Sequence, residues 1–197
     1  MIENTKLIRM YKMKKSIITG VMLLMGIFVS NVSAEVRPMV MGGIYAGGDD
    51  LVETTTEDLQ AGGFLYIGAG VLIEPENSNM VFQATLGYKW DTIEFDLPSG
   101  DSTISSNPLE ITAYIRTDNV RLGGGIAYHM SPEWEFCLDG SGCAKADFDD
   151  ALGFILEGVW DASRNVAVGL RFTSIDYETN GLTIDANNIG VNVGFIF

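Results

Sequence analysis

The sequence predicts an all-β protein, a single eight-stranded antiparallel up-and-down transmembrane β-barrel, from three observations. Apolar side chains alternate with polar or small ones in eight segments after residue 34, and no helical period of useful length appears there. The connections between these segments are alternately long and short, as in barrels that turn tightly at one membrane surface only. The even number of segments puts both ends of the chain at that surface.

Each predicted strand is bounded by turn-forming residues. The strands are expected at residues 37–46, 62–73, 80–95, 108–117, 120–129, 151–161, 166–173 and 187–197. Long connections are expected at residues 47–61, 96–107, 130–150 and 174–186, and short ones at 74–79, 118–119 and 162–165. One face of the strands is apolar, whereas the other carries charges that a dry soluble core would not hold. This favours a membrane barrel over a soluble β-sandwich or a lipocalin-like barrel, in which the apolar face would point inward.

The last predicted strand ends on an aromatic residue. Its apolar side chains share one face, and they are Ile189, Val191, Val193, Phe195 and Phe197. A tilted strand of about ten residues is long enough to cross a bilayer. The strand with its terminal Phe197 resembles the assembly signal of small bacterial outer-membrane β-barrel proteins, the porin-like family with eight-stranded members. In that signal Val193, Phe195 and Phe197 are the expected assembly residues.

This resemblance covers nearly all of the chain after residue 34, through its pattern of alternation. It implies a place in the bacterial outer membrane, with both termini in the periplasm. It also implies contacts with outer-membrane lipid and lipopolysaccharide, escort by periplasmic chaperones, insertion by the barrel assembly machinery, and a monomeric barrel. Members of such families include envelope-stabilising, adhesive and small-solute-passing proteins, so the fold does not decide the role.

The first 34 residues are expected to be a secretory signal peptide. Two lysines follow Met13, and the apolar run at residues 17–29 has 13 residues, too few for a transmembrane helix. Cleavage is predicted between Ala34 and Glu35, which leaves residues 35–197 as one outer-membrane barrel domain. The polar residues 1–12 suit a signal peptide poorly, so Met13 is the expected start, and an unusually long n-region is the alternative.

Charge excludes one class of partner. After residue 34 the chain has seven Lys and Arg against 25 Asp and Glu, a net charge near −18, so nucleic acid is not an expected partner. The predicted long connections hold 16 of the carboxylates, with Lys145 as their only basic residue. Such loops could recruit divalent cations. Residues 147–150, the densest acidic cluster, match no EF-hand spacing, so a solvated acidic surface is the favoured interpretation. No cofactor is expected.

The two cysteines lie close together in a glycine-rich segment. An exported chain with one pair of cysteines predicts a disulfide, here between Cys137 and Cys143. A zinc site would need more ligands than this segment offers, because His129 is the only histidine in the chain.

The inward face of the predicted strands carries charges of both signs. The expected lumen charge network consists of Lys89, Glu110, Arg116, Arg121, Glu157 and Arg171. An eight-stranded barrel is just wide enough for side chains to fill, so these groups should pair with each other and leave no wide pore. The two-residue turn at 118–119 sets Arg116 opposite Arg121 and Tyr114 opposite Gly123. Glu157 is the inward carboxylate expected to balance the two opposed arginines.

The favoured function is therefore an integral outer-membrane protein without enzymatic activity, which has a filled lumen and stabilises the envelope or presents surface loops. The first alternative is a narrow porin-like channel for ions or small solutes. The second is a lipid A-modifying enzyme, in which His129 would pair with a carboxylate and a serine. Outer-membrane lipid A deacylases have a His two residues before their Ser, but here Phe172 precedes Ser174, so this class is disfavoured and no catalytic residue is expected.

Overall fold

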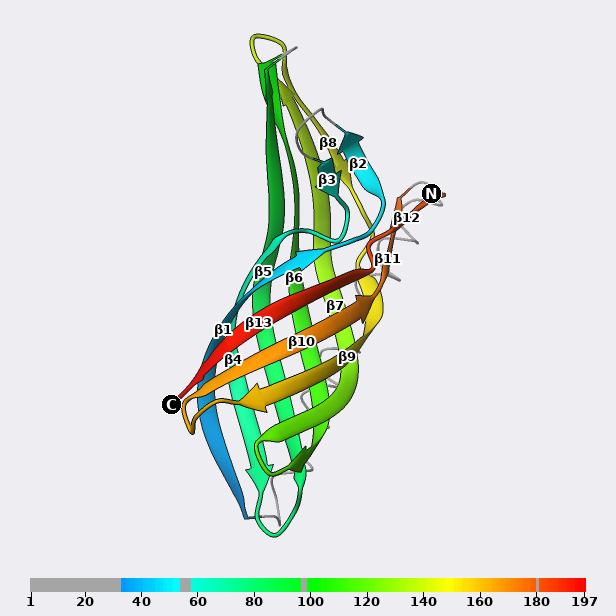
Figure 1. The fold of residues 1–197 in the computed structure, drawn as a ribbon. Coiled ribbons are helices and arrows are strands. Elements are labelled where there is room, and N and C mark those ends of the chain that lie inside the picture. Colours follow the sequence, from blue (N-terminus) through cyan, green and yellow to red (C-terminus); the bar gives the residue numbers. More distant parts are fainter. Residues whose placement is uncertain (1–32, 54–57, 97–98, 180) are drawn as a thin grey trace.

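The computed structural model describes residues 33–53, 58–96, 99–179 and 181–197, and it is an all-β structure (Figure 1). The predicted signal peptide lies outside these residues except for its last two positions. Eight strands close into a ring in which every neighbouring pair is antiparallel. Across the described residues, we find no helix with the length and hydrophobicity needed to span a membrane.

The ring follows chain order, as an up-and-down barrel requires. Its strands are β1 (Ala34–Ala46), β4 (Leu65–Pro75), β5 (Met80–Asp96), β6 (Ser99–Thr117), β7 (Val120–Leu138), β9 (Ala151–Asp161), β10 (Val166–Ser174) and β13 (Asn188–Ile196). Strand β13 pairs with β1 and closes the ring, with Phe195 opposite Val40. The eight predicted strands are all present, and the fold class is confirmed.

The predicted long connections at residues 96–107 and 130–150 are wrong, because most of their residues form strands. Strands β6 and β7 have 19 residues each and continue, with β5, beyond the rest of the barrel at the top of Figure 1. There β8 (Gly142–Asp147) pairs with β7. We call this projecting sheet the tower; it consists of residues 91–96, 99–105, 133–138 and β8. Polar and apolar residues still alternate in the tower. Its many Asp and Glu residues nevertheless resemble the composition of a loop.

The other two long connections contain hairpins. They are formed by β2 (Asp50–Glu53) with β3 (Asp58–Gln60), and by β11 (Asp176–Thr179) with β12 (Leu182–Asp185). Leu59 of β3 is fully buried with Ile93 and Ile104 of the tower. The first hairpin therefore covers the apolar face of the tower sheet near its base.

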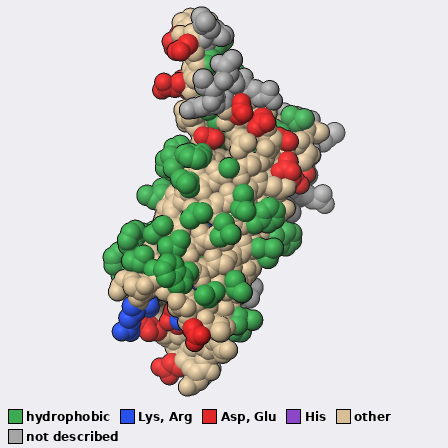
Figure 2. All heavy atoms as spheres, in the orientation of Figure 1, with side chains coloured by type: hydrophobic (Ala, Val, Ile, Leu, Met, Phe, Trp, Pro, Cys, Tyr) green, Lys and Arg blue, Asp and Glu red, His purple; other side chains and the backbone are tan. Residues whose placement is uncertain are grey.

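Burial alternates along the strands, with apolar side chains outside and polar ones inside. Phe154, Leu156 and Leu122 point outward and are 67, 65 and 64% exposed, whereas Arg121 and Arg171 point inward and are 1% exposed. On the face seen in Figure 2, apolar side chains form a belt around the barrel, with carboxylates above it and charges of both signs below it. This pattern is the inverse of a soluble barrel and suits a lipid environment.

The hairpin between β6 and β7 has the predicted register. Arg116 faces Arg121 and Tyr114 faces Gly123 across the two strands. A Cβ atom on Gly123 would lie 2.7 Å from Cδ1 of Tyr114, so only glycine lets this ring lie flat against β7.

Candidate functional site: the lumen and the outer surface

Arg171 lies inside the barrel between two carboxylates from different strands. Its Nη1 atom lies 2.7 Å from Oε2 of Glu110 on β6, and its Nη2 atom lies 3.0 Å from Oε2 of Glu157 on β9. We call these three residues the central triad; all are buried. A buried charge is costly unless it is paired and hydrogen-bonded, so the triad belongs to the packing of the lumen.

Hydroxyl and amide groups complete the hydrogen bonding of the two carboxylates. Tyr66 and Thr85 donate to Oε2 of Glu110 at 3.3 and 3.0 Å. Tyr114 and Asn192 donate to the carboxylate on β9 at 2.6 and 2.8 Å. The donors come from β4, β5, β6 and β13, so the triad connects strands from all around the ring. Such a connected network fixes the side chains in place rather than lining an open path.

Lys89 is buried in the lumen apart from the triad. Its ammonium lies 4.5 Å from the ring centroid of Tyr45, and no ion pair joins it to a carboxylate within the part of the chain that the structure describes. The triad has one cation for two carboxylates, so Lys89 compensates its remaining negative charge at longer range. The ring face of Tyr45 stabilises the ammonium further.

The other two predicted lumen arginines form a separate cluster near the short turns. Arg121 binds Asp161 through Nη2 and Nε at 2.7 and 3.2 Å. Arg116 lies 2.6 Å from Glu74 and 3.6 Å from Asp161. The prediction that Glu157 balances the opposed arginines is wrong, because it belongs to the central triad one layer away. Asp161 was missed because it ends its strand next to a turn, where a carboxylate usually faces solvent.

Apolar side chains form a layer on each side of the central triad. Toward the short turns the buried residues include Met39, Leu72, Val81, Val159, Ala167 and Ile196. Toward the tower a second buried cluster closes the mouth, with Leu59, Ala61, Ile93, Ile104, Phe148, Ala151, Ile175, Tyr177, Ile184 and Ala186. The hairpins β2–β3 and β11–β12 contribute to this cap. The lumen is thus filled by side chains from one end to the other.

His129 lies beneath the cap and is 2% exposed. Its Nδ1 atom lies 2.7 Å from the hydroxyl of Tyr177 on β11 and 3.2 Å from Oγ of Ser106 on β6. A Ser–His contact of this kind resembles part of a hydrolytic site, but here it is closed off from lipid and from solvent. The contact joins β11 to the barrel wall, and neither Ser106 nor Tyr177 was singled out from the sequence.

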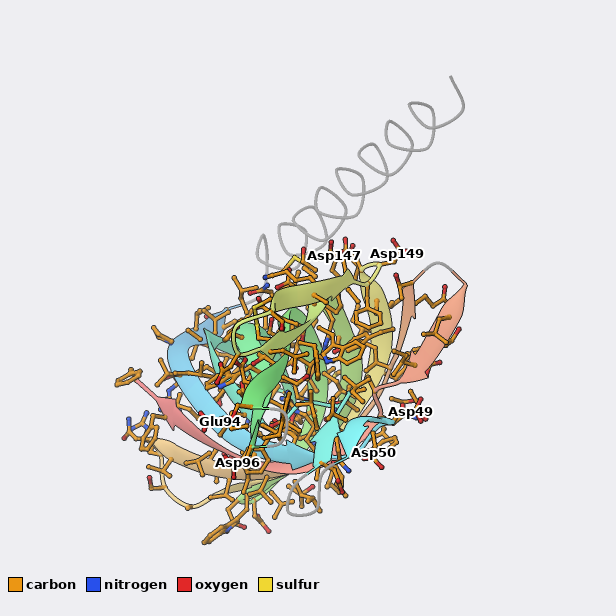
Figure 3. The ribbon with its side chains drawn as sticks, turned by 90° about the horizontal axis from the view of Figure 1, so that it is seen from above. Asp49, Asp50, Glu94, Asp96, Asp147 and Asp149 are labelled. Atoms are coloured by element: carbon orange, nitrogen blue, oxygen red, sulfur yellow. A yellow bond between two sulfur atoms is a disulfide. The ribbon has the colours of Figure 1, made fainter. Side chains whose placement is uncertain are left out.

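The tower end of the barrel carries carboxylates on several sides of its mouth. Seen from above, labelled carboxylates lie on different sides of the mouth (Figure 3), and they are Asp49, Asp50, Glu94, Asp96, Asp147 and Asp149. Lys145 of the tower lies 2.9 Å from Glu133 and 3.2 Å from Glu135, and these hydrogen bonds raise the pKa of its ammonium. The basic side chain predicted among the acidic residues is therefore already paired.

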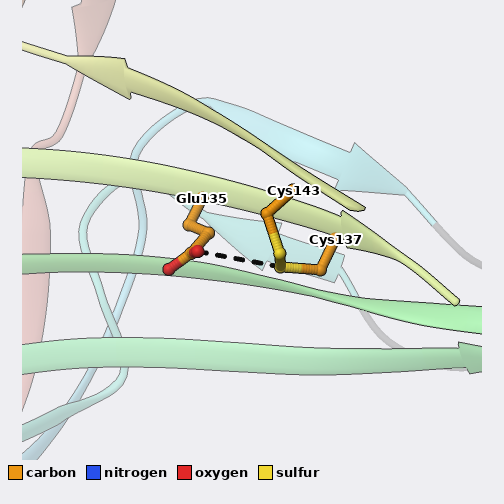
Figure 4. A group of neighbouring side chains, drawn as sticks. All are labelled: Glu135, Cys137 and Cys143. Carbon is orange, nitrogen blue, oxygen red and sulfur yellow. Dashed lines mark hydrogen bonds between the residues drawn. A yellow bond between two sulfur atoms is a disulfide. The ribbon is translucent and has the colours of Figure 1, made fainter. Parts of the chain in front are cut away.

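The predicted disulfide joins Cys137 of β7 to Cys143 of β8, directly opposite in register (Figure 4). Glu135 approaches the sulfur of Cys137 at 3.7 Å. A disulfide sulfur has no proton to donate and is not a thiolate ligand, so this contact is neither a strong hydrogen bond nor part of a metal site. In the described part of the chain, these three residues form the only group of three or more His, Cys, Asp or Glu whose ligand atoms all lie within 4.8 Å of one another.

The predicted assembly residues lie on the lipid-facing side of the closing strand. Phe195 and Phe197 are 50 and 69% exposed, and Val193 shares their face. The N–H of Phe197 donates to the carbonyl of Pro38 at 2.9 Å, just beyond the end of β13. At the other end, Ala34 and Glu35 begin β1, so the predicted cleavage point coincides with the first strand.

These features define a class: a small transmembrane β-barrel with a filled lumen and an acidic projecting sheet. No family model matches the sequence, and no curated protein matches it. Solved structures do match, and two of them are small outer-membrane proteins of bacteria.

One is Ail, the attachment invasion locus protein of Yersinia pestis, in complex with the heparin analogue sucrose octasulfate. It superposes with a TM-score of 0.55 at 10% identity, over 84% of this chain and 99% of that chain. The other is Neisserial surface protein A, with a TM-score of 0.51 at 10% identity, over 84% of this chain and 99% of that chain. The chain therefore has the fold of small outer-membrane β-barrel proteins.

Proposed function

We propose that the protein is an integral outer-membrane protein without enzymatic activity, which holds its acidic tower at the cell surface and conducts no solute. The observation that carries this proposal is the central triad, enclosed between two apolar layers. Conduction would require these layers to part and Arg171 to leave both of its partners, and breaking a buried ion pair costs about 3–5 kcal/mol.

We infer the orientation from the two ends of the barrel. Short turns and both described chain ends lie at one end, and the tower and hairpins lie at the other. Single-chain bacterial barrels have short periplasmic turns, so we place the termini in the periplasm and the tower outside. The apolar belt would then contact outer-membrane lipid and lipopolysaccharide. Chaperone escort, insertion by the barrel assembly machinery and a monomeric state belong to the same proposal.

The charge of the tower bears on its partners. Ail is described in complex with a polysulfated sugar, but here the outer surface is acidic and its tower lysine is paired with two carboxylates. A polyanion would be repelled by this surface, whereas cationic partners or divalent cations would be attracted. We therefore propose that the tower presents an acidic surface to cationic partners.

Bilayer recording and electrophoresis test this proposal together. The purified protein should show heat-modifiable migration, which reports a folded barrel, and no steady current in planar bilayers. Steady current steps that change in Arg171→Gln would establish the narrow channel instead. An altered lipid A mass profile in overexpressing cells, absent in His129→Ala, would establish the lipid A enzyme. Recovery of the protein from the soluble periplasm would refute the membrane location.

A further inference from the structure

The short turn at residues 162–165, between β9 and β10, lies beside the end of the closing strand (Figure 1). The β10–β13 ladder pairs Val166 with Phe195, so the next position sets Asn165 opposite Ile196. The N–H of Ile196 donates to the main-chain carbonyl of Asn165 at 2.9 Å. The turn therefore continues the ladder for one residue beyond the start of β10.

The side chain of Asn165 takes the place of a missing main-chain bond. In an antiparallel ladder, the two residues of a hydrogen-bonded pair exchange both of their N–H···O bonds. Here the N–H of Asn165 donates to Oγ of Ser163 at 3.2 Å and is directed away from Ile196. Nδ2 of Asn165 donates to the carbonyl of Ile196 instead, at 2.6 Å. A carboxamide suits this role because it supplies an N–H donor on a short side chain.

The turn can hold β13 before the barrel closes. Strands β10 and β13 are joined by the β11–β12 hairpin, whereas β1 lies at the other end of the described chain. Pairing between nearby segments costs less chain entropy than pairing between distant ones. We therefore expect β13 to pair with β10 first and with β1 last.

Until β1 arrives, the opposite edge of β13 is open. Alternate residues of a strand direct their N–H and C=O groups to opposite edges. Since Ile196 faces the turn, Phe195 and Phe197 face β1, and in the closed barrel the N–H of Phe197 donates to the carbonyl of Pro38 at 2.9 Å. An open edge is costly in lipid, so it is the part of the unfinished barrel that an assembly protein has to cover.

We propose that Asn165 is a positioning residue for barrel assembly. It holds the end of β13 extended from the β10 side, so that the main-chain groups of Phe195 and Phe197 are already in place for the barrel assembly machinery on the open side. The inference rests on the proposed function in taking insertion by that machinery as the route.

Arg37 of β1 bonds to the same turn from the other side. Its Nη2 atom donates to the main-chain carbonyl of Arg164 at 2.5 Å. Because Arg37 belongs to β1, this bond forms only when the ring closes. Removal of the Arg37 donor therefore weakens the finished turn without affecting the end of β13 before closure, which makes it the matched control for Asn165.

The test follows folding of the full chain by heat-modifiable migration, in lipid vesicles with and without the purified barrel assembly machinery. The ratio of the two rates is the acceleration, in which a general folding defect cancels. Asn165→Asp keeps the size of the side chain but replaces its N–H donor with an oxygen. We expect its acceleration to fall about two- to tenfold, the factor of one hydrogen bond. Arg37→Met should keep the wild-type acceleration, although both variants lower the urea midpoint.

An unchanged acceleration in Asn165→Asp, or an equal fall in Arg37→Met, would overturn the inference. An Asn165→Asp chain that folds in neither kind of vesicle would also overturn it, because the residue would then be needed for the fold itself. If the machinery accelerates the wild type and Asn165→Asp equally, the inference alone fails. If it does not accelerate the wild type, the proposed insertion route fails and the inference with it.

Discussion

The ring of Tyr66 lies against Gly87 on the neighbouring strand, where any Cβ atom would collide with it. The same ring also covers Gly68, which stands opposite Gly87 in the β4–β5 register. This position brings the Tyr66 hydroxyl to Glu110 of the central triad. Two glycines on adjacent strands therefore make room for one of the donors that the buried carboxylate needs.

Replacing the covered glycine should destabilise the barrel. In Gly87→Ala the new methyl group displaces the Tyr66 ring and removes its hydrogen bond, at a cost of about 1–3 kcal/mol in the free energy of unfolding. Urea titration in lipid vesicles measures this loss. Gly42→Ala is the matched control, because its Cβ would lie an ordinary 3.6 Å from the carbonyl of Tyr66. Equal stability of the two variants would contradict this account.

Removing only the cation of the triad should lower the free energy of unfolding more than removing all three of its charges does. Arg171→Met leaves two buried carboxylates without their partner, and we expect a loss of about 3–5 kcal/mol in the free energy of unfolding. Adding Glu110→Gln and Glu157→Gln removes the unpaired carboxylates but also the long-range counter-charge of buried Lys89, and should restore part of that loss. Denaturant titration of the single and triple variants decides the matter. A triple variant less stable than Arg171→Met would show that the charges have another role.

The disulfide should stabilise the tower without stabilising the barrel. Its six-residue separation corresponds to about 2 kcal/mol of loop-closure entropy, which acts only on the β7–β8 hairpin. The double variant Cys137→Ser, Cys143→Ser should be cut by protease within β8 much sooner than the oxidised protein. Its heat-modifiable migration and urea midpoint should not change. A lowered urea midpoint would mean that the tower and the barrel unfold together.

Deleting Phe197 should impair assembly more than stability. The side chain is 69% exposed and lies beyond the last ladder pair, so the folded barrel loses little when it is removed. We expect reduced outer-membrane insertion in cells, measured by fractionation, with a nearly unchanged urea midpoint for the refolded protein. Phe172→Ala, a lipid-facing change on β10, should show the opposite pattern. Normal insertion of the deleted chain would refute an assembly role.

The barrel could be predicted because its decisive signals are local. Alternation is read within one segment, and the two-residue turn at 118–119 sets the register of β6 and β7 without any distant contact. The side chains facing inward follow from the same alternation, which is why Arg171 and Glu110 could be named together. Their pairing across four strands of the ring could not be read in the same way.

The rest depends on contacts between distant parts of the chain. Tyr177 meets His129 only because the β11–β12 hairpin folds back over the mouth, and no pattern near either residue indicates this. Apart from residues 91–95, the tower was expected to be loop because its polar face is rich in carboxylates. The residues that bury its apolar face include members of β2 and β3, which lie far away in the sequence. Composition separates strand from loop poorly when one face of a sheet is acidic.

The length of β6 has a consequence for access to the cell. The tower part of β6, residues 99–105, adds on the order of 25 Å of extended chain beyond the barrel wall, at about 3.3 Å per residue. That reach is close to the thickness of the hydrocarbon core of a bilayer, about 30 Å. In the proposed orientation, the tip, tied by its sulfur bridge, would be an epitope that an antibody or a neighbouring cell meets before it meets any lipid.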